Sequence, residues 1–200
     1  MTAPLKISAD EALNRLLEGN RRFAADKAIG PHRSESRRLE ITKGQQPFAI
    51  ILGCVDSRVP PELIFDQGLG DLFVIRSAGQ VIDEAVLGSI EFGVFELGIP
   101  LIMVLGHSRC GAVTATIEML EKNLSAEGSI GKLVENIKPS VDQVSGHGEQ
   151  LIDRAARKNV ELEISRLKAA PIVANALQQE KLKIVGAFYD LSDGLVEIMD

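Results

Sequence analysis

The sequence predicts an α/β fold in which a mostly parallel central β-sheet is flanked by helices, with an N-terminal helical arm and a C-terminal antiparallel edge hairpin. Three observations support this prediction. Short apolar runs such as 48–53 and 100–105 are typical of strands that are covered on both faces, as in a parallel sheet. Helical patterns alternate with these runs, which is the order of strand–helix–strand units. The last two apolar segments flank Ser192-Asp193-Gly194, a turn sequence that indicates a hairpin.

The arm begins with a helix-start signal. Ser8 and Glu11 have the spacing of a capping box. Apolar residues then recur at helical spacing on one face, namely Leu13, Leu16, Leu17 and Phe23. The following segment, 27–46, is polar and lacks a continuous apolar face, so we expect it to cross a surface rather than join the core.

The remaining elements follow in order along the chain. We expect strands at 48–53, 71–76, 100–107, 182–189 and 195–198. Prolines at 60 and 61 predict a short helix that ends near Phe65, because proline is tolerated in a first helical turn. Longer helices are expected at 83–97, 110–122, 130–144 and 149–181, the last interrupted at Pro171.

Length and composition are those of one domain. The chain has 200 residues, of which 45% are hydrophobic, enough for a full core. We therefore expect a single domain over 1–200, with the helical arm and crossing segment at 1–46 and the α/β core at 47–200. The net charge of −6 argues against nucleic acid or an anionic membrane as the principal partner. No secretory or membrane-spanning segment is visible, so cytoplasmic residence is expected.

Reactive residues follow two of the predicted strands. Cys54 directly follows the first run, the third strand ends at His107, and Cys110 comes three residues later. Ligands gather at the carboxyl ends of parallel strands, so these side chains are expected to converge. Two thiolates and an imidazole suit Zn²⁺, and a three-ligand set leaves one position open, as in a catalytic site. The alternative is that these are two buried cysteines and a core histidine without a metal.

Asp56 and Arg58 favour the metal site. Each is a two-residue step from Cys54, so both lie on the side of the thiol if the strand direction persists. A charged pair at the buried end of a strand is costly without a function, although a structural ion pair that fixes the loop is the simpler alternative. At this point a family resemblance emerges: Cys54-Val55-Asp56-Ser57-Arg58 and Gly106-His107-Ser108-Arg109-Cys110-Gly111 resemble the paired signature of the β-class carbonic anhydrases.

The resemblance implies a function and a set of roles. It implies a zinc lyase that reversibly hydrates carbon dioxide to bicarbonate and a proton by attack of zinc-bound hydroxide. Zinc would be held by Cys54, His107 and Cys110, with Asp56 and Arg58 as the catalytic dyad. Substrate contacts are implied for Gln45, Phe73 and the backbone amide of Gly111, and Phe73 is a position that is often supplied across a dimer interface. A homodimer or homotetramer is implied as well.

Two departures bear on the subgroup. In some members the aspartate matching Asp56 becomes a fourth zinc ligand at low pH, in a closed form associated with a tryptophan. This chain has no Trp, and Ile51 stands in that neighbourhood, so we expect a site that stays open. The stretch from Arg76 to Gln80 also lacks the asparagines that flank the small residues more often in the family.

Competing functions use the same residues. One is hydrolysis of carbonyl sulfide or carbon disulfide on the same fold. Another, from a different class, is a non-catalytic zinc or bicarbonate-sensing module, against which the presence of Asp56, Arg58 and Gln45 argues. His32 and His147 lie in polar, glycine-flanked segments and are expected to be solvated.

Overall fold

A five-stranded sheet forms the centre of the computed structural model, which describes residues 7–199. The strands are β1 (Ala49–Cys54), β2 (Leu72–Ser77), β3 (Leu101–His107), β4 (Lys183–Tyr189) and β5 (Val196–Met199). Their order in the sheet is β2-β1-β3-β4-β5. The first four are parallel, and β5 pairs antiparallel with β4. The predicted fold class is confirmed, including the antiparallel edge.

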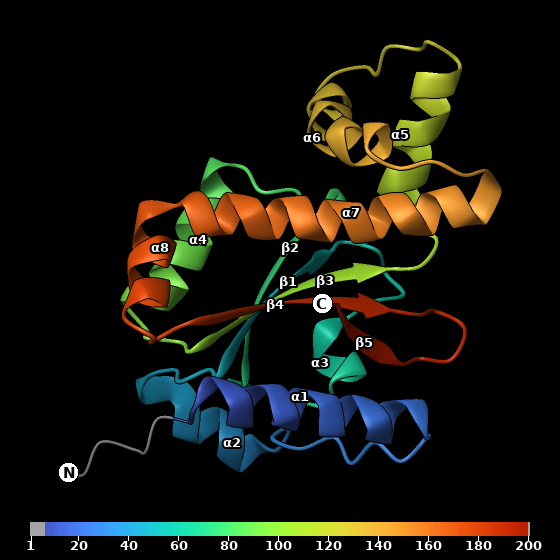
Figure 1. Cartoon of the computed structure of the whole chain (residues 1–200). Helices are drawn as coiled ribbons and strands as arrows, with labels where there is room; N and C mark the ends of the chain where they lie inside the picture. The colour runs from blue at the N-terminus through green and yellow to red at the C-terminus, as the bar shows by residue number, and fades with distance from the viewer. Residues whose placement is uncertain (1–6, 200) are drawn as a thin grey trace.

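Helices cover both faces of this sheet (Figure 1). On one side lie α1 (Ala9–Ala24) and α3 (Pro61–Ile64). On the other side lie α4 (Glu84–Phe95), α7 (Gly148–Ala169) and α8 (Pro171–Gln178). The helices α5 (Gly111–Glu121) and α6 (Ile130–Asp142) pack on each other near the carboxyl ends of the strands, where the 3-10 turn η2 (Ala78–Gln80) also lies.

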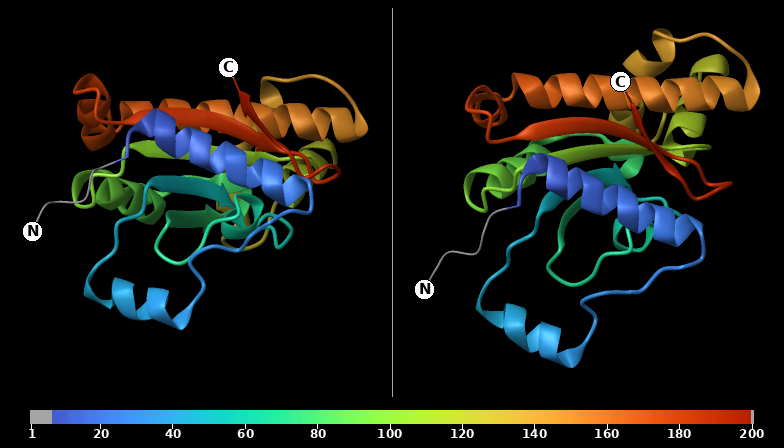
Figure 2. Two further views of the ribbon diagram at one scale, coloured as in Figure 1. Left: turned by 90° about the horizontal axis from the view of Figure 1, so that it is seen from below. Right: turned by 60° about the horizontal axis from the view of Figure 1, so that its bottom comes forward.

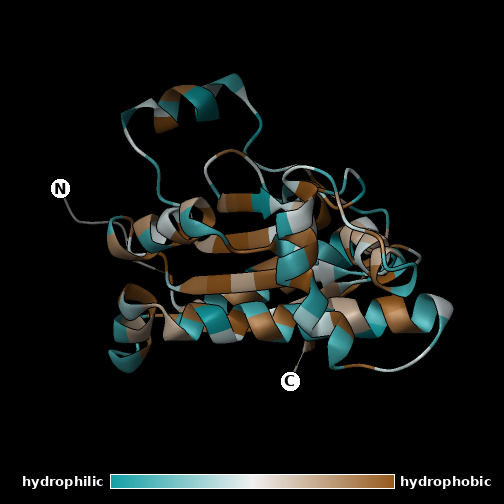
Figure 3. Cartoon of the chain, turned by 90° about the horizontal axis from the view of Figure 1, so that it is seen from above, coloured by the Kyte–Doolittle hydropathy of each residue, from teal (hydrophilic) through white to brown (hydrophobic). Residues whose placement is uncertain are grey.

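The strands alternate their side chains between two apolar layers. Ile51, Met103 and Ala187 contribute to the layer that α1 covers, whereas Ile50 and Val104 contribute to the layer under α4 and α7. Burial on both faces explains why β1 and β3 are apolar at nearly every position. Figure 3 shows this distribution, with hydrophobic strands enclosed by helices of mixed hydropathy. None of the helices in the described part of the chain is long and apolar enough to cross a membrane.

The predicted capping box opens α1. The Ser8 side chain accepts from the Glu11 N–H at 3.2 Å, and the Glu11 carboxylate accepts from the Ser8 N–H at 2.8 Å. The buried Asn20 on the same helix donates to the carbonyl of Gly194 and accepts from the Val196 N–H, each at 2.8 Å. These bonds join the first helix to the terminal hairpin.

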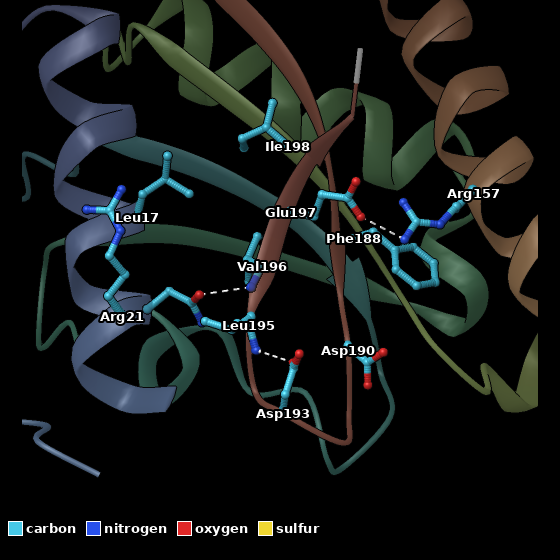
Figure 4. A pocket seen from close by; sticks show the side chains of 11 residues that line it. Leu17, Arg21, Arg157, Phe188, Asp190, Asp193, Leu195, Val196, Glu197 and Ile198 are labelled. Carbon is cyan, nitrogen blue, oxygen red and sulfur yellow. Dashed lines mark hydrogen bonds and ion pairs between the residues drawn. The ribbon is translucent and has the colours of Figure 1, made fainter. Parts of the chain in front are cut away.

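Figure 4 shows the pocket of about 460 Å³ between α1 and β5. Arg157 from α7 forms an ion pair with Glu197 at 2.9 Å and stacks over the Phe188 ring. In the turn between β4 and β5, the Leu195 N–H donates to the Asp193 side chain at 2.8 Å.

The crossing segment contains a short helix that the sequence pattern did not predict. α2 (Glu35–Glu40) and the 3-10 turn η1 (Ile41–Lys43) project away from the sheet in both views of Figure 2. None of their residues is buried, so no apolar periodicity marks them. Their start is set by the Ser34 side chain, which accepts from the Arg37 N–H at 3.2 Å.

Candidate metal centre

Two neighbouring strand ends bring the predicted ligands together. Cys54 is the last residue of β1, and His107 is the last residue of the adjacent β3. Cys110 follows after a tight turn and is the N-cap residue of α5. The ligand atoms of Cys54, His107 and Cys110 all lie within 4.8 Å of one another, and all three residues are buried. Cys54 thus forms one compact cluster with two residues that lie more than fifty positions later in the sequence.

The histidine is oriented for metal binding. The Nδ1 atom of His107 lies 3.0 Å from the backbone carbonyl of Ser108, which fixes Nδ1 as the proton-bearing nitrogen. The other ring nitrogen, Nε2, is therefore a bare acceptor. It is buried and has no hydrogen-bond partner among the described residues. A buried, unsatisfied lone pair beside two sulfurs is the environment expected of a metal ligand.

The two sulfurs are close enough to compete for one proton. A hydrogen bond from the Cys110 thiol lowers the pKa of Cys54 to about 4, and the backbone N–H groups of Asp56 and Gly79 lower this pKa by smaller amounts. The neighbouring Cys54 sulfur and burial raise the pKa of Cys110. A divalent cation between the sulfurs would replace that shared proton. The donor set, two thiolates and one neutral imidazole, fits Zn²⁺ with one tetrahedral position left open.

Asp56 and Arg58 form a bidentate pair beside this cluster. Arg58 Nε donates to Asp56 Oδ1 at 3.0 Å, and Nη2 donates to Oδ2 at 2.8 Å. The backbone N–H of Arg58 adds a third bond to Oδ1 at 2.9 Å. The hydrogen bonds from Arg58 outweigh burial and lower the pKa of Asp56 to about 2. The aspartate is therefore ionised at neutral pH, and both its oxygens are turned toward the guanidinium.

The turn between His107 and Cys110 is held from three directions. Arg109 has a left-handed backbone, with a φ of 53°. Its N–H donates to Asp153 Oδ1 at 3.0 Å, and its Nη2 donates to Ser192 Oγ at 3.1 Å. Its carbonyl accepts from Arg58 Nη2 at 3.3 Å. These contacts involve residues remote in the sequence, and no local pattern predicted that Asp153 and Ser192 would bind this turn.

Arg76 fixes the loop that leaves β1. It lies on β2 and donates through Nε to the carbonyl of Cys54 at 2.8 Å, and through Nη2 to the carbonyl of Asp56 at 2.6 Å. In the sequence, Arg76 stands out only as part of the stretch from Arg76 to Gln80 that departs from the family pattern. The structure gives Arg76 a direct part in shaping the backbone between the candidate ligand and the dyad.

The three substrate-contact candidates do not all meet at this cluster. Gly111 adjoins Cys110 as the first residue of α5, with its backbone exposed. Phe73 pairs with Ile50 near the start of β1, which places it about 13 Å along the strand from Cys54 at ~3.3 Å per residue. Gln45 is exposed and precedes β1, farther still from the cluster. Within one chain, Gln45 and Phe73 belong to the opposite end of the sheet.

His32 and His147, both expected to be solvated, lie in different surroundings in the structure. His147 is the N-cap residue of α7 and makes no side-chain cap bond. His32 is not simply solvated: its Nδ1 lies 2.8 Å from both carboxylate oxygens of the buried Asp71. The sequence interpretation was incomplete here because the partner lies 39 positions away, in the loop before β2.

Comparison with known proteins identifies relatives over nearly the whole chain. A family model described as carbonic anhydrase matches residues 49–196. A carbonic anhydrase of Mycolicibacterium smegmatis is 42% identical over 188 residues, covering 94% of this chain and 91% of that protein.

Solved structures agree with the sequence relatives. A Coccomyxa β-carbonic anhydrase in complex with acetazolamide has a TM-score of 0.75 and 28% identity, covering 94% of this chain and 86% of the other. One of the tetrameric β-carbonic anhydrases of the filamentous ascomycete Sordaria macrospora has a TM-score of 0.75 and 25% identity. The match covers 94% of this chain and 96% of the other.

Proposed function

Because the chain belongs to the β-class carbonic anhydrases, enzymes that reversibly hydrate carbon dioxide to bicarbonate and a proton, we propose that Cys54, His107 and Cys110 hold its zinc ion. The observation that carries this proposal is the compact cluster of ligand atoms, all within 4.8 Å of one another. The buried, unpartnered Nε2 of His107 supports it independently. When bound, zinc supplies Lewis-acid activation of water at the open coordination position.

The dyad acts on the nucleophile. The ionised carboxylate of Asp56 accepts a hydrogen bond from the O–H of the attacking water and so directs a lone pair of the water oxygen toward the carbon of carbon dioxide. Arg58 keeps this carboxylate ionised, because its bidentate hydrogen bonds lower the Asp56 pKa. The same bonds favour the open form, since Asp56 would have to leave Arg58 to become a fourth metal ligand. We assign the backbone amide of Gly111, at the start of α5, to a substrate oxygen.

The active enzyme is a homodimer or homotetramer in which a second copy completes the site. Gln45 and Phe73 lie at the opposite end of the sheet from Cys54, so a neighbouring copy is the natural source of these two side chains. Phe73 is on the edge strand β2, and its ring stacks with the half-exposed Phe92 of α4 at 6.4 Å between centroids. Phe95 on the same helix is 73% exposed. An apolar surface of this kind is typical of an interface between subunits.

The 200 residues act as one domain, and the enzyme resides in the cytoplasm. Contacts of α1 with β1, β3 and α3 support the first point, because they tie the arm to the core. The two thiols support the second, since a reducing compartment keeps Cys54 and Cys110 available as metal ligands.

A direct test combines metal analysis with stopped-flow hydration kinetics on the purified protein. We expect a stoichiometric amount of zinc and rapid hydration of carbon dioxide. Cys54→Ser and His107→Ala should lose the metal, and retention of zinc in either variant would contradict the ligand assignment. Parallel assays with carbonyl sulfide address the alternative substrate, because high carbonyl sulfide turnover with negligible carbon dioxide hydration would favour it. A zinc-loaded protein that is inactive on both substrates would favour the sensing module.

A further inference from the structure

A backbone amide faces the sulfur of Cys54. The N–H of Gly79 donates to Cys54 Sγ at 3.4 Å, a distance suited to a sulfur acceptor. Gly79 lies in η2, directly after β2, and has a left-handed backbone with a φ of 63°. A Cβ at this position would also come within 2.8 Å of Ile137 Cδ1 and 3.3 Å of Ala112 Cβ. Both the backbone conformation and the close packing therefore require glycine here.

Glycine alone does not hold that amide in place. Because its φ and ψ are the least restricted of any residue, the direction of its N–H depends on what anchors the neighbouring peptides. On the N-terminal side, the carbonyl of Ser77 accepts from the Val55 N–H at 3.1 Å. On the C-terminal side, the carbonyl of Gly79 accepts from Asn159 Nδ2 at 2.7 Å.

Asn159 reaches Gly79 from the middle of α7, the long helix that crosses the sheet in Figure 1. Its side chain is buried, with 1% of the residue exposed. Its other amide atom, Oδ1, has no hydrogen-bond partner among the described residues. A buried acceptor without a partner costs at least as much stability as one hydrogen bond contributes. An apolar side chain at this position would remove the unpaired Oδ1 and leave the Gly79 carbonyl without its donor, so one unpaired acceptor would replace another and the stability of the fold would change little.

We propose that Asn159 is a positioning residue of the metal centre: by holding the Gly79 carbonyl, it keeps the Gly79 N–H directed at the Cys54 sulfur. This inference rests on the zinc site proposed above. Asn159 lies 105 positions from Cys54 in the sequence, and no motif or periodic pattern marks it.

The hydrogen bond matters because the ligand set is rich in negative charge. Two thiolates donate more electron density to a cation than neutral ligands do, and this weakens its ability to polarise water. A hydrogen bond to a ligating sulfur withdraws part of that density, a general means of tuning metal centres from outside the ligand set. Asn159 therefore preserves the acidifying power of the metal without touching the metal or the substrate.

The test replaces Asn159 with leucine, a side chain of similar branched shape that cannot donate. Cobalt(II) serves as the spectroscopic probe, and zinc affinity is measured by competition with a chelator. We expect the thiolate-to-cobalt charge-transfer band of Asn159→Leu to move to lower energy, because the sulfur electrons are less stabilised. We also expect zinc to bind about 10-fold or more weakly, as is typical when an outer contact of a ligand is lost. The thermal midpoint should stay near that of the unaltered protein.

Asn159→Ala provides a second variant that lacks the donor, should leucine prevent folding. Asn20→Ala is the matched control, since Asn20 is also a buried asparagine that clamps the carbonyl of a glycine, but at the terminal hairpin. It should lower the thermal midpoint and leave the cobalt spectrum unchanged. An unchanged spectrum and zinc affinity in the folded Asn159 variants would overturn the inference. Failure of the unaltered protein to bind either metal would instead overturn the proposed zinc site.

Discussion

Asp56 is a residue whose role can be separated from metal binding. It lies two residues after Cys54, and its carboxylate pairs with Arg58 rather than with the three ligand side chains. We expect Asp56→Ala to retain zinc and to lose about 10²–10⁴-fold in carbon dioxide hydration, the range typical of a lost acid–base or orienting group. Stopped-flow rates and metal content at alkaline pH check this expectation. An unchanged rate with zinc in place would refute the orienting role.

The burial of Glu163 leads us to expect that the stability of the protein depends on pH. It is buried on α7, where burial raises its pKa from the ordinary 4.5 to about 7 despite the nearby Arg166. Because the folded state holds the proton more tightly than the unfolded state, the free energy of unfolding falls as the pH rises from 4.5 to about 7. The loss amounts to about 3 kcal/mol at most, at ~1.4 kcal/mol for each pKa unit.

Glu163→Gln should remove most of this slope. We expect the difference in unfolding free energy between pH 5 and pH 8, measured by urea denaturation at equal zinc loading, to shrink by up to about 3 kcal/mol relative to the unaltered protein. Glu161→Gln is the control, since Glu161 lies half exposed on the same helix and pairs with Lys158. If the unfolding free energies of Glu163→Gln and of the unaltered protein changed equally between pH 5 and pH 8, Glu163 would be ionised in the folded state at both pH values.

At the scale of elements, the loop from 66 to 71 anchors the crossing segment. Asp66 is fully buried and accepts from Arg22 Nε at 2.7 Å, from the Ile29 N–H at 3.1 Å and from the Gly30 N–H at 2.8 Å. At the other end of the loop, Asp71 binds residues of α1 and of the segment itself. The hydrogen bonds of these two carboxylates therefore hold the crossing segment against the fold, because the segment has few apolar contacts that could do so.

Asp66→Asn should loosen the segment without unfolding the core. Asparagine replaces one carboxylate oxygen of Asp66 with an NH2 group, which then faces N–H donors instead of accepting from them. We therefore expect the free energy of unfolding to fall by about 2 kcal/mol. Trypsin should then cleave faster at Arg33 and Arg38, two exposed arginines of the crossing segment. Glu40→Gln is the control, because Glu40 is 67% exposed and pairs only at the surface. Equal cleavage of Asp66→Asn and the control would contradict the anchoring role.

Elements that bury a face were predictable, and those held by distant polar contacts were not. β1 and β3 are visible because both faces are covered, and the common direction of parallel strands brings Cys54 next to His107. α2 escaped prediction because it buries nothing. Gly79 and Asn159 escaped for a related reason: an interaction between a loop carbonyl and a helix 80 positions later leaves no periodic signal.

At the scale of the whole molecule, the residues that we propose for the site lie at two opposite ends of the sheet in one chain. Cys54, His107 and Cys110 gather at the carboxyl ends of the strands, whereas Gln45 precedes β1 at the amino end. A fold this well packed cannot bring the two ends together, because β1 lies between them as a buried, hydrogen-bonded strand. Apposition of two copies is the simplest way to complete the site.

Complementation between two inactive variants tests this arrangement. Consider a dimer that combines an Asp56→Ala subunit with a Gln45→Ala subunit. At one of its two sites, the Gln45→Ala subunit supplies an intact Asp56 and the Asp56→Ala subunit supplies an intact Gln45. The other site lacks both residues. Random pairing on co-expression makes half of the dimers mixed, so about one quarter of all sites should be intact. Hydration rates of the co-expressed mixture should therefore rise to about a quarter of the unaltered enzyme's rate, well above either variant alone. If Gln45 served the metal centre of its own chain, every mixed dimer would carry two defective sites, and the rate would stay at the average of the separate variants.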